Sequence, residues 1–286
     1  MIPLFKVFVS PDAPAYVSVT LKSGYIGEGP QVEEFENALS AYIGADVVTV
    51  NSGTSAIWLA LDLLGVDINT YVIASPMTCL ASNIPALHLG AKVLWADVDR
   101  SGVIDPVSVQ NLLEKLPWQQ RSRVRAILFT SYGGVPPDYE RLREVAGNIP
   151  LVEDAAHAFG TEYSGQMTGM FADISCFSFQ AIKLLTTGDG GALVMPSCTF
   201  RWKEAKRKRW FGLDRSKGGF RCEQNVTELG YKFHMNDIAA SIGLMNLPHV
   251  PTLLAQIREN ALFYDEALTL PHIEGISIPE RPIMSN

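Results

Sequence analysis

The sequence predicts an α/β protein in which helices pack on a central, largely parallel sheet. Short β-branched or apolar runs alternate with longer segments whose apolar residues recur at helical spacing, which is the first observation behind this prediction. Small polar residues also follow several of these runs, where parallel strands end and ligands collect. With 286 residues, 47% of them hydrophobic, the chain is long enough for one large core and a smaller second unit.

The N-terminal segment is expected to be an arm of ~25 residues, because Pro3, Pro11 and Pro14 interrupt regular structure. A turn-rich loop, GYIGEGP, comes next. It leads into a helix over 31–42 whose apolar side chains recur every three or four residues, and Gly44 ends that helix.

The remaining elements follow from the same patterns. Strands are expected at 47–50, 71–74, 92–96, 126–130, 150–153 and 192–195. Helices are expected at 56–64, 82–89, 105–116, 138–146, 199–209, 236–246 and 253–268. Asp105 and Pro106 occupy the cap and first-turn positions of one helix, and Pro248 and Pro251 separate the last two.

Bulk composition excludes few functions but weighs against several. A net charge of −7 does not favour a nucleic-acid partner. One basic run, Arg201–Arg209, has two interpretations: a solvated helix face, or a contact with an anionic substrate. The four cysteines form no CxxC pair, so no disulfide framework or metal site is expected. Without an N-terminal leader pattern or ~18 uninterrupted apolar residues, we expect a cytoplasmic protein with no membrane contact.

Three polar segments lie at the carboxyl ends of predicted strands: 51–55, 75–79 and 154–157. Since these ends share one edge of a parallel sheet, we expect the segments to converge there. The first, NSGTS, opens a helix whose free N–H groups could bind a phosphate. Simple capping of that helix by Ser52 or Thr54 is the alternative.

The stretch Leu151–Gly191 carries an acid, a hydroxyl and an amine in an order that suits pyridoxal 5'-phosphate. Lys183 could form an imine with the cofactor aldehyde. Asp154 could keep the ring nitrogen protonated, although Glu153 competes for that role because the strand direction does not decide which side chain points inward. Ser178 could reach the phosphate.

Each of these residues also has an ordinary structural interpretation. A lysine beside apolar neighbours is often a surface residue, and an aspartate after a strand is often a helix cap. His157 could pack on the ring or bond its hydroxyl, but a single histidine is more often a core residue.

Five ordered motifs together resemble one family. GYIGEGPQVEEFE, NSGTSA, EDAAHAFG, FSFQAIKLLTTGDGG and GYKFHMNDIAASIGL, spread over 24–247, are similar to the signatures of the DegT/DnrJ/EryC1/StrS aminotransferases. These are pyridoxal-phosphate enzymes of fold type I that act on nucleotide-linked keto sugars. The resemblance implies a three-layer sandwich around a mostly parallel, mixed sheet.

The resemblance also implies residue roles. Lys183 becomes the imine lysine and proton carrier, Asp154 the partner of the ring nitrogen, and His157 a neighbour of the ring hydroxyl. The positions that contact the phosphate fall on Gly53, Thr54 and Ser178, with Ser55 adjacent.

The chain departs from the family pattern at three places. Cys79 stands where members often have an aromatic residue stacked on the cofactor ring. Lys232, Phe233 and His234 stand where an Asn-x-Arg pattern reaches the partner subunit's phosphate, so Lys232 is expected to take that contact. The chain is also shorter than usual, which predicts a large cofactor domain over 1–247 and a linker helix with an incomplete, truncated C-terminal domain over 248–286.

The function that the resemblance implies is transfer of an amino group from an amino acid such as glutamate to a nucleotide-linked keto sugar, in a homodimer. One alternative is a pyridoxal-phosphate sugar dehydratase. Such members have histidine in place of the imine lysine, so Lys183 weighs against it. The other is a non-catalytic protein that binds the cofactor as a regulator or serves as a truncated partner.

Overall fold

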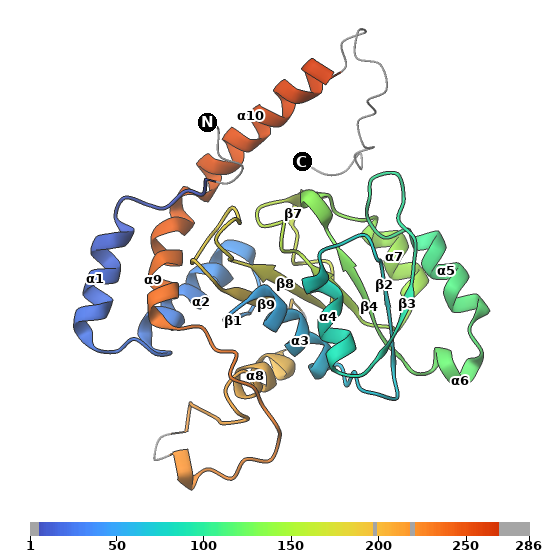
Figure 1. The fold of residues 1–286 in the computed structure, drawn as a ribbon, viewed down its shortest axis with the longest axis horizontal. Coiled ribbons are helices and arrows are strands. Elements are labelled where there is room, and N and C mark those ends of the chain that lie inside the picture. The colour runs from blue at the N-terminus through green and yellow to red at the C-terminus, as the bar shows by residue number, and fades with distance from the viewer. Residues whose placement is uncertain (1–5, 197–198, 218–220, 269–286) are drawn as a thin grey trace.

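A seven-stranded sheet forms the centre of the protein, with the strand order β1-β9-β8-β5-β4-β2-β3 (Figure 1). The computed structural model describes residues 6–196, 199–217 and 221–268. The strands of this sheet are β1 (Val47–Val50), β2 (Tyr71–Ala74), β3 (Lys92–Trp95), β4 (Val124–Thr130), β5 (Leu151–Asp154), β8 (Ile174–Ser178) and β9 (Gly191–Val194). Strand β9 runs antiparallel to β1 and β8, and the other pairings are parallel. The predicted α/β class with a mostly parallel, mixed sheet is therefore confirmed.

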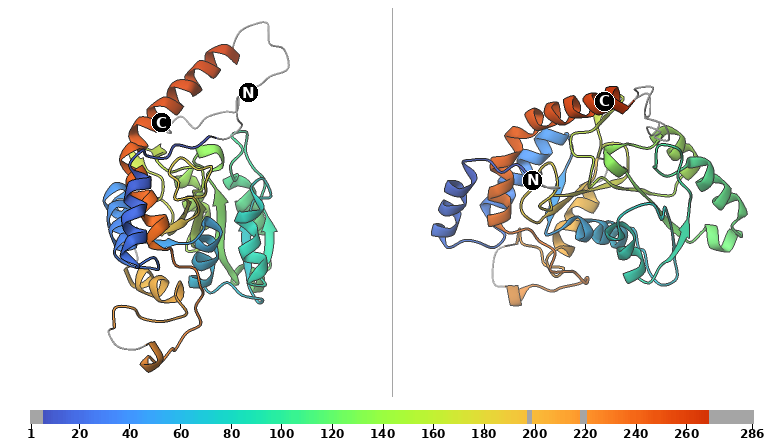
Figure 2. Two further views of the ribbon diagram at one scale, coloured as in Figure 1. Left: turned by 60° about the vertical axis from the view of Figure 1, so that its left-hand side comes forward. Right: turned by 45° about the horizontal axis from the view of Figure 1, so that its top comes forward.

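Helices cover both faces of the sheet and make a three-layer sandwich (Figure 2). One face is covered by α3 (Gly53–Leu63), α4 (Leu80–His88) and α8 (Thr199–Lys208). The opposite face is covered by α2 (Pro30–Ile43), α5 (Pro106–Lys115), α7 (Tyr139–Ala146) and α9 (Asp237–Asn246). Shorter elements are α6 (Trp118–Arg121), the hairpin of β6 (Glu162–Tyr163) and β7 (Gln166–Met167), and the 3-10 turns Tyr132–Gly134, Arg221–Glu223 and Leu247–His249.

Strand β5 lies in the middle of the sheet and is buried on both faces. Leu151 packs with the α5 and α7 side, and Val152 packs with the α3 and α4 side. Because side chains alternate along a strand, the next two residues, Glu153 and Asp154, must also point to opposite faces. This alternation decides which carboxyl group can face a site beside α3 and α4.

The N-terminal arm is more regular than predicted, because it contains the helix α1 (Ala13–Ser23). Pro14 lies in the first turn, where a missing N–H costs nothing and the fixed φ favours a helix. The helix packs against α9, with Thr20 Oγ1 2.8 Å from Ser241 Oγ. The prediction that Pro14 interrupts regular structure was therefore wrong, because Pro14 lies at the start of a helix.

The turn-rich loop before α2 is fixed by the start of α9. Asp237 Oδ1 accepts hydrogen bonds from the N–H groups of Gly29 (2.8 Å) and Val32 (3.1 Å), so its carboxylate satisfies the first turn of α2. A Cβ on Gly29 would lie 2.6 Å from Asp237 Oδ2. Two motifs more than 200 residues apart therefore meet at this point.

The last described helix, α10 (Val250–Leu268), extends away from the sheet (Figure 1). It starts three residues earlier than predicted, since Pro251 is accommodated in its first turn. By length and composition alone, the helical stretch Asp237–Leu268 could cross a membrane, although 39% of its apolar window is buried inside the protein. The rest of the predicted C-terminal unit, 269–286, lies outside the described residues.

Candidate active site

A cavity of about 360 Å³ lies at the carboxyl ends of β1, β4, β5 and β8. All three predicted polar segments contribute to it, through Ser52–Thr54, through Thr78 and Cys79, and through Asp154, Ala156 and His157. Residues after β8 complete it, with Ser178 and Lys183 among them. Its volume is within the range of roughly 300–1,000 Å³ that small-molecule sites occupy. The segments predicted to converge on one edge of the sheet thus line a single cavity.

Asp154 ends β5 and lines this cavity from its buried wall. Its Oδ2 accepts a hydrogen bond from Ser82 Oγ at 2.5 Å, and its Oδ1 accepts one from the N–H of Ala156 at 3.1 Å. Burial raises the pKa of Asp154 above its ordinary value, although both hydrogen bonds oppose the rise. A cationic group in the cavity would therefore find a desolvated, oriented carboxyl group.

Glu153, the competing candidate, is fully buried on the opposite face of β5. Its Oε1 accepts hydrogen bonds from Ser131 Oγ and Tyr139 Oη, both at 2.6 Å, and its Oε2 accepts one from Ser175 Oγ at 2.9 Å. It does not line the cavity. The alternative that the sequence left open is decided by the alternation of β5, and Asp154 is the carboxyl group that faces the cavity.

Lys183 is half-buried in the turn that follows β8 and lines the same cavity. Its backbone N–H donates to the carbonyl of Gln180 at 2.9 Å, which fixes the turn. Burial lowers the pKa of its amine, and the charges of Asp154 and Cys79 oppose this. The amine is thus closer to its neutral, nucleophilic form than that of an exposed lysine.

His157 lies on the turn after β5 and is partly exposed to the cavity. Its Nδ1 accepts a hydrogen bond from the N–H of Gly133 at 3.3 Å, and its ring lies 5.7 Å from that of Tyr132. Burial and then the charge of Lys183 lower its pKa. The lowered pKa favours the neutral imidazole, and because Nδ1 accepts from Gly133, the proton of that form lies on Nε2.

The N-terminus of α3 forms another wall of the cavity. Gly53 and Thr54 line it, and Ser178 from β8 lies beside them. A Cβ added to Gly53 would lie only 2.8 Å from Ser178 Cβ, so glycine is required for α3 and β8 to approach this closely. A helix N-terminus with exposed N–H groups and a serine hydroxyl suits an anion.

Helix capping and anion binding are both possible at this helix N-terminus because Ser52 caps the helix while Ser178 lines the cavity. Ser52 caps α3, since its Oγ accepts from the N–H of Ser55 at 3.0 Å. Ser55 is buried, bonds Ser52 and does not line the cavity. The three predicted phosphate contacts, Gly53, Thr54 and Ser178, all line the cavity, and Ser55, which the sequence placed beside them, is bonded to Ser52.

Cys79 is exposed and lines the cavity from the start of α4. Tyr132, which the sequence did not single out, lines it too and is 44% exposed. Its position directly after the strand ending at Thr130 was the available signal, since that is another carboxyl end at the same edge. Others missed in the same way are Ile57, Ala81, Thr130, Gln180, Ile182 and Asp189.

Lys232 does not line the cavity, but its backbone is hydrogen-bonded to Asn51, the residue before Ser52. The carbonyls of Phe233 and Lys232 accept hydrogen bonds from the N–H (2.6 Å) and side chain (3.3 Å) of Asn51, which precedes α3. The Lys232 ammonium stands 3.6 Å from the centre of the Trp210 ring. Burial lowers the pKa of the neighbouring His234 to about 4, and Lys232 adds to this.

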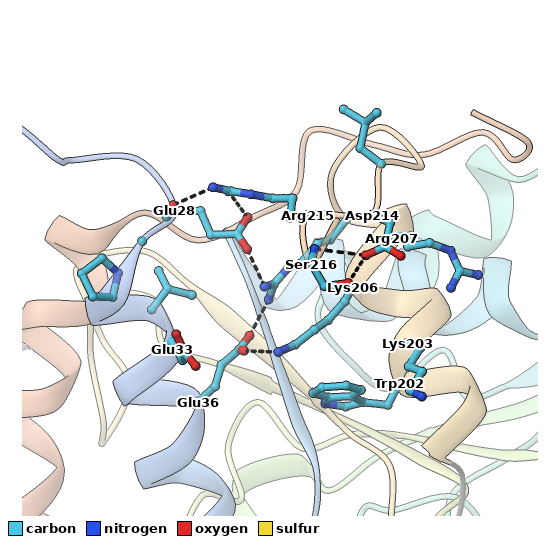
Figure 3. A pocket seen from close by; sticks show the side chains of 15 residues that line it. Glu28, Glu33, Glu36, Trp202, Lys203, Lys206, Arg207, Asp214, Arg215 and Ser216 are labelled. Carbon is cyan, nitrogen blue, oxygen red and sulfur yellow. Dashed lines mark hydrogen bonds and ion pairs between the residues drawn. The ribbon is translucent and has the colours of Figure 1, made fainter. Parts of the chain in front are cut away.

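Part of the basic run Arg201–Arg209 lines a second cavity, of about 780 Å³, between α2 and α8 (Figure 3): Trp202, Lys203, Lys206, Arg207 and Arg209. Lys206 Nζ lies 3.0 Å from Glu36 Oε2. Arg209 is buried and pairs with both Glu36 and Glu28, the latter at 2.7 Å. Burial alone would raise the pKa of Glu36, but Arg209 and Lys206 together lower it.

Two further cations of the run are paired as well. Arg207 Nε lies 2.5 Å from Glu228, and Lys208 Nζ lies 2.8 Å from Asp62. Much of the run therefore joins α8 to α2, α3 and the following loop. Neither interpretation of the sequence, a solvated face or an anion site, anticipated this structural role.

The first cavity combines features that fit pyridoxal phosphate. A buried carboxyl group and a half-buried amine line the same space, and a glycine-bearing helix N-terminus lies at another wall. This suits a small ring with a basic nitrogen and an anionic end. Among the described residues, no group of three or more His, Cys, Asp or Glu side chains could hold a metal ion.

Comparison with known proteins agrees with this chemistry. The model of the "DegT/DnrJ/EryC1/StrS aminotransferase family" matches residues 10–283. The UDP-4-amino-4,6-dideoxy-N-acetyl-beta-L-altrosamine transaminase of Campylobacter jejuni (serotype O:23/36) is 34% identical over 255 residues, which cover 88% of this chain and 65% of that protein. The chain thus spans somewhat less than two thirds of that relative's length.

Two solved structures are also similar over nearly the whole chain. The crystal structure of AtS13 from Actinomadura melliaura is 39% identical, with a TM-score of 0.91 over 100% of this chain and 77% of that one. The PLP form of Spr1654, a sugar aminotransferase from Streptococcus pneumoniae, is 29% identical, with a TM-score of 0.85 over 96% of this chain and 74% of that one.

Proposed function

The chain belongs to the DegT/DnrJ/EryC1/StrS aminotransferase family, and on that premise we propose that it is an aminotransferase that uses pyridoxal phosphate to move an amino group from an amino acid to a sugar. The observation that carries the proposal is that Asp154 and Lys183 line one cavity beside the N-terminus of α3. When bound, the cofactor supplies an aldehyde that takes up the amino group and a protonated ring that draws electrons from the reacting carbon.

The acid and the anion-binding wall would hold the two ends of the ligand. The Asp154 carboxylate, kept in place by Ser82 and Ala156, would bind the protonated ring nitrogen. The N–H groups at the start of α3, with Thr54 and Ser178, would hold the phosphate. His157, neutral and carrying its proton on Nε2, would donate to the ring hydroxyl.

Lys183 would attach the cofactor and later carry a proton. Its Nζ has a lowered pKa because of burial, so it can lose and regain a proton near neutral pH more readily than an exposed lysine. Cys79 and Tyr132 would cover the faces of the ring, since both line the cavity and are partly open to it. The smaller side chain of Cys79 leaves more space on its side than an aromatic one.

We take glutamate as the amino donor and a nucleotide-linked keto sugar as the acceptor. The support for the sugar is the name of the Campylobacter jejuni relative, which describes a transaminase of a UDP-linked amino sugar. Expected partners are therefore small molecules, with a second copy of the chain completing the site.

A homodimer is part of the proposal, with Lys232 reaching the partner subunit's phosphate site. Lys232 is exposed, and the segment that precedes it extends from the body of the protein (Figure 1). Replacing Lys232 with Ala would then weaken cofactor retention, and unchanged retention would argue against this contact.

Two other functions are weaker. A sugar dehydratase of this family would carry histidine at the position of Lys183. A regulator that only binds the cofactor would need no proton carrier. The cavity contains both a lysine with a lowered pKa, Lys183, and the carboxyl group of Asp154. This combination favours an aminotransferase over a dehydratase or a regulator.

The proposal is tested by visible absorption. Purified protein mixed with pyridoxal phosphate is expected to show a yellow band that disappears when glutamate is added, and that is absent from Lys183→Ala. Lys203→Ala, at an exposed lysine of the other cavity, is the matched control and should behave as the wild type. A protein that takes up no cofactor would refute the enzyme, and one whose band ignores every amino donor would favour the regulator.

A further inference from the structure

Three hydroxyl groups form a continuous line from Asp154 back to the cavity. Ser82 Oγ, on α4, donates to Asp154 Oδ2 at 2.5 Å. Thr78 Oγ1, just before α4, lies 2.7 Å from Ser82 Oγ, and Thr130 Oγ1, at the end of β4, lies 3.0 Å from Thr78 Oγ1. Ser82 is 1% exposed, whereas Thr78 and Thr130 line the cavity. We call this line the hydroxyl chain.

Counting protons gives the hydroxyl chain a direction. An ionised carboxylate can only accept, so Ser82 must donate its single proton to Asp154. Ser82 can then only accept from Thr78, and Thr78 in turn can only accept from Thr130. All three hydroxyls point their protons toward Asp154 as long as it carries its charge.

We propose that Ser82, backed by Thr78 and Thr130, is a positioning residue of the cofactor site that fixes Oδ2 of Asp154 and holds the carboxylate ionised for the ring nitrogen. The inference rests on the proposed function for the role of the cofactor, whereas the effect of Ser82 on the orientation and pKa of Asp154 does not depend on it. Aligned hydroxyls polarise one another, so each bond is strengthened by about 10–30% relative to an isolated one.

The geometry leaves the rest of Asp154 free for a ligand. Among the described residues, the donor to Oδ1 is the N–H of Ala156, and a carboxylate has about four acceptor positions. The hydroxyl chain occupies the side of Oδ2 that is turned into the protein, toward the 1%-exposed Ser82. Because the carboxyl group is bonded at both oxygens, it cannot rotate away from the cavity that it lines.

Burial, more than the neighbouring charges, determines the pKa of Asp154, so a hydrogen bond is needed to keep the carboxylate ionised. Lys183 and His157 face it from the turns after β8 and β5, and both lower its pKa, each by less than the hydrogen bonds from Ser82 and Ala156 do. Cys176, on the neighbouring strand β8, is a buried thiol whose pKa is itself raised by burial and by Asp154. Glu153 points to the other face. Burial is opposed mainly by the hydrogen bond from Ser82.

The test follows the Asp154 carboxyl group itself, by carbon-13 NMR titration of the cofactor-free protein, with Asp154→Asn used for assignment. Ser82→Ala is expected to raise the pKa of Asp154 by about one unit, a tenfold change in proton affinity, because a hydrogen bond to a charged group is lost. Ser82→Thr should keep the wild-type value. Thr78→Val, which leaves Ser82 in place, should give a smaller shift in the same direction and serves if Ser82→Ala does not fold.

Ser131→Ala is the matched control, because it removes a buried serine hydroxyl that donates to Glu153 instead. It should leave the titration of Asp154 unchanged. Equal titration curves for wild type, Ser82→Ala and Thr78→Val would overturn the inference, as would a shift of the same size in Ser131→Ala.

Cofactor binding distinguishes this inference from the proposed function. With pyridoxal phosphate, the pH at which affinity is lost on the acid side should rise by about one unit in Ser82→Ala, whereas a merely structural defect would lower affinity equally at every pH. Wild-type protein that binds no cofactor would refute the proposed function and leave the NMR result to decide the inference. Wild-type binding with an unshifted acid limb in Ser82→Ala would refute the inference alone.

Discussion

The two carboxyl groups at the end of β5 have opposite surroundings although they are adjacent in sequence. Glu153 accepts hydrogen bonds from the hydroxyls of Ser131, Tyr139 and Ser175 and from the backbone of Gly169, which fill its acceptor positions. Asp154 has one hydroxyl donor and one backbone N–H, and its remaining capacity faces a cavity that also contains Lys183. Burial raises the pKa of both.

The difference separates a structural role from a binding role. A buried carboxyl group whose acceptor positions are filled by the protein has nothing left to offer a ligand. A carboxylate that is buried with only half of its acceptor positions filled loses more hydration energy than its hydrogen bonds replace. A bound cation offsets this loss. The number of donors distinguishes the two residues, while burial and pKa direction do not.

The largest effect is expected from Lys183→Ala, which leaves both carboxyl groups in place and removes the amine that faces only one of them. Transfer of the amino group should fall by roughly 10²–10⁴-fold, the usual worth of a positioned proton carrier. The rate of consumption of glutamate measures this. A variant retaining a tenth of the wild-type rate would mean that another group carries the proton.

Asp154→Asn should weaken cofactor affinity by about 10- to 100-fold, because a charge-assisted hydrogen bond is worth roughly 1.5–3 kcal/mol. The free energy of unfolding of the cofactor-free protein should not fall, since burial of the charged group is unfavourable. Cofactor titration measures the affinity, and urea unfolding measures the free energy of unfolding. A variant that binds the cofactor normally but unfolds more easily would reverse the assignment of roles.

Tyr139→Phe tests the other face of β5. Glu153 loses one of its two donors at Oε1, so the protein should be destabilised by about 1–3 kcal/mol at pH 7. Cofactor affinity should change by less than about twofold. Loss of affinity with intact stability would instead place the Glu153 hydrogen-bond network in the cofactor site.

Glu153→Gln should change the pH dependence of stability. Burial raises the pKa of Glu153 in the folded protein, so between the ordinary and the raised value the native state binds more protons than the unfolded chain. The free energy of unfolding of the wild type therefore falls as pH rises through this window. Glutamine does not titrate, so the variant should show a flatter profile there, by roughly 1.4 kcal/mol for each unit of raised pKa. Parallel profiles for the two proteins would exclude a raised pKa at Glu153.

Much of the fold was predictable because the signals were local. The alternation of apolar runs and helical spacing placed six of the seven strands of the sheet within one or two residues, as for Val47–Val50 and Tyr71–Ala74, but β8 was not among the expected strands. Prolines were misread, since Pro14 and Pro251 begin helices and do not break them. A proline's effect depends on its place in the helix, which the pattern alone does not give.

The candidate site was predictable in its members but not in its geometry. Asp154, His157, Ser178 and Lys183 all line the cavity. The choice between Glu153 and Asp154 needed the register of β5, and the role of Ser82 needed the packing of α4 on β5. The pairing of Arg209 with Glu28 and Glu36 joins residues far apart in sequence and left no local signal.

We propose above that pyridoxal phosphate binds in the cavity lined by Asp154 and Lys183 and is attached to Lys183. The most direct measurement is reduction of the cofactor-loaded protein with borohydride, followed by mass spectrometry of its peptides. We expect one pyridoxyl-phosphate group per chain, on the peptide that contains Lys183, and none in Lys183→Ala. A label on another lysine, or no label in a protein that is folded and mixed with excess cofactor, would contradict it.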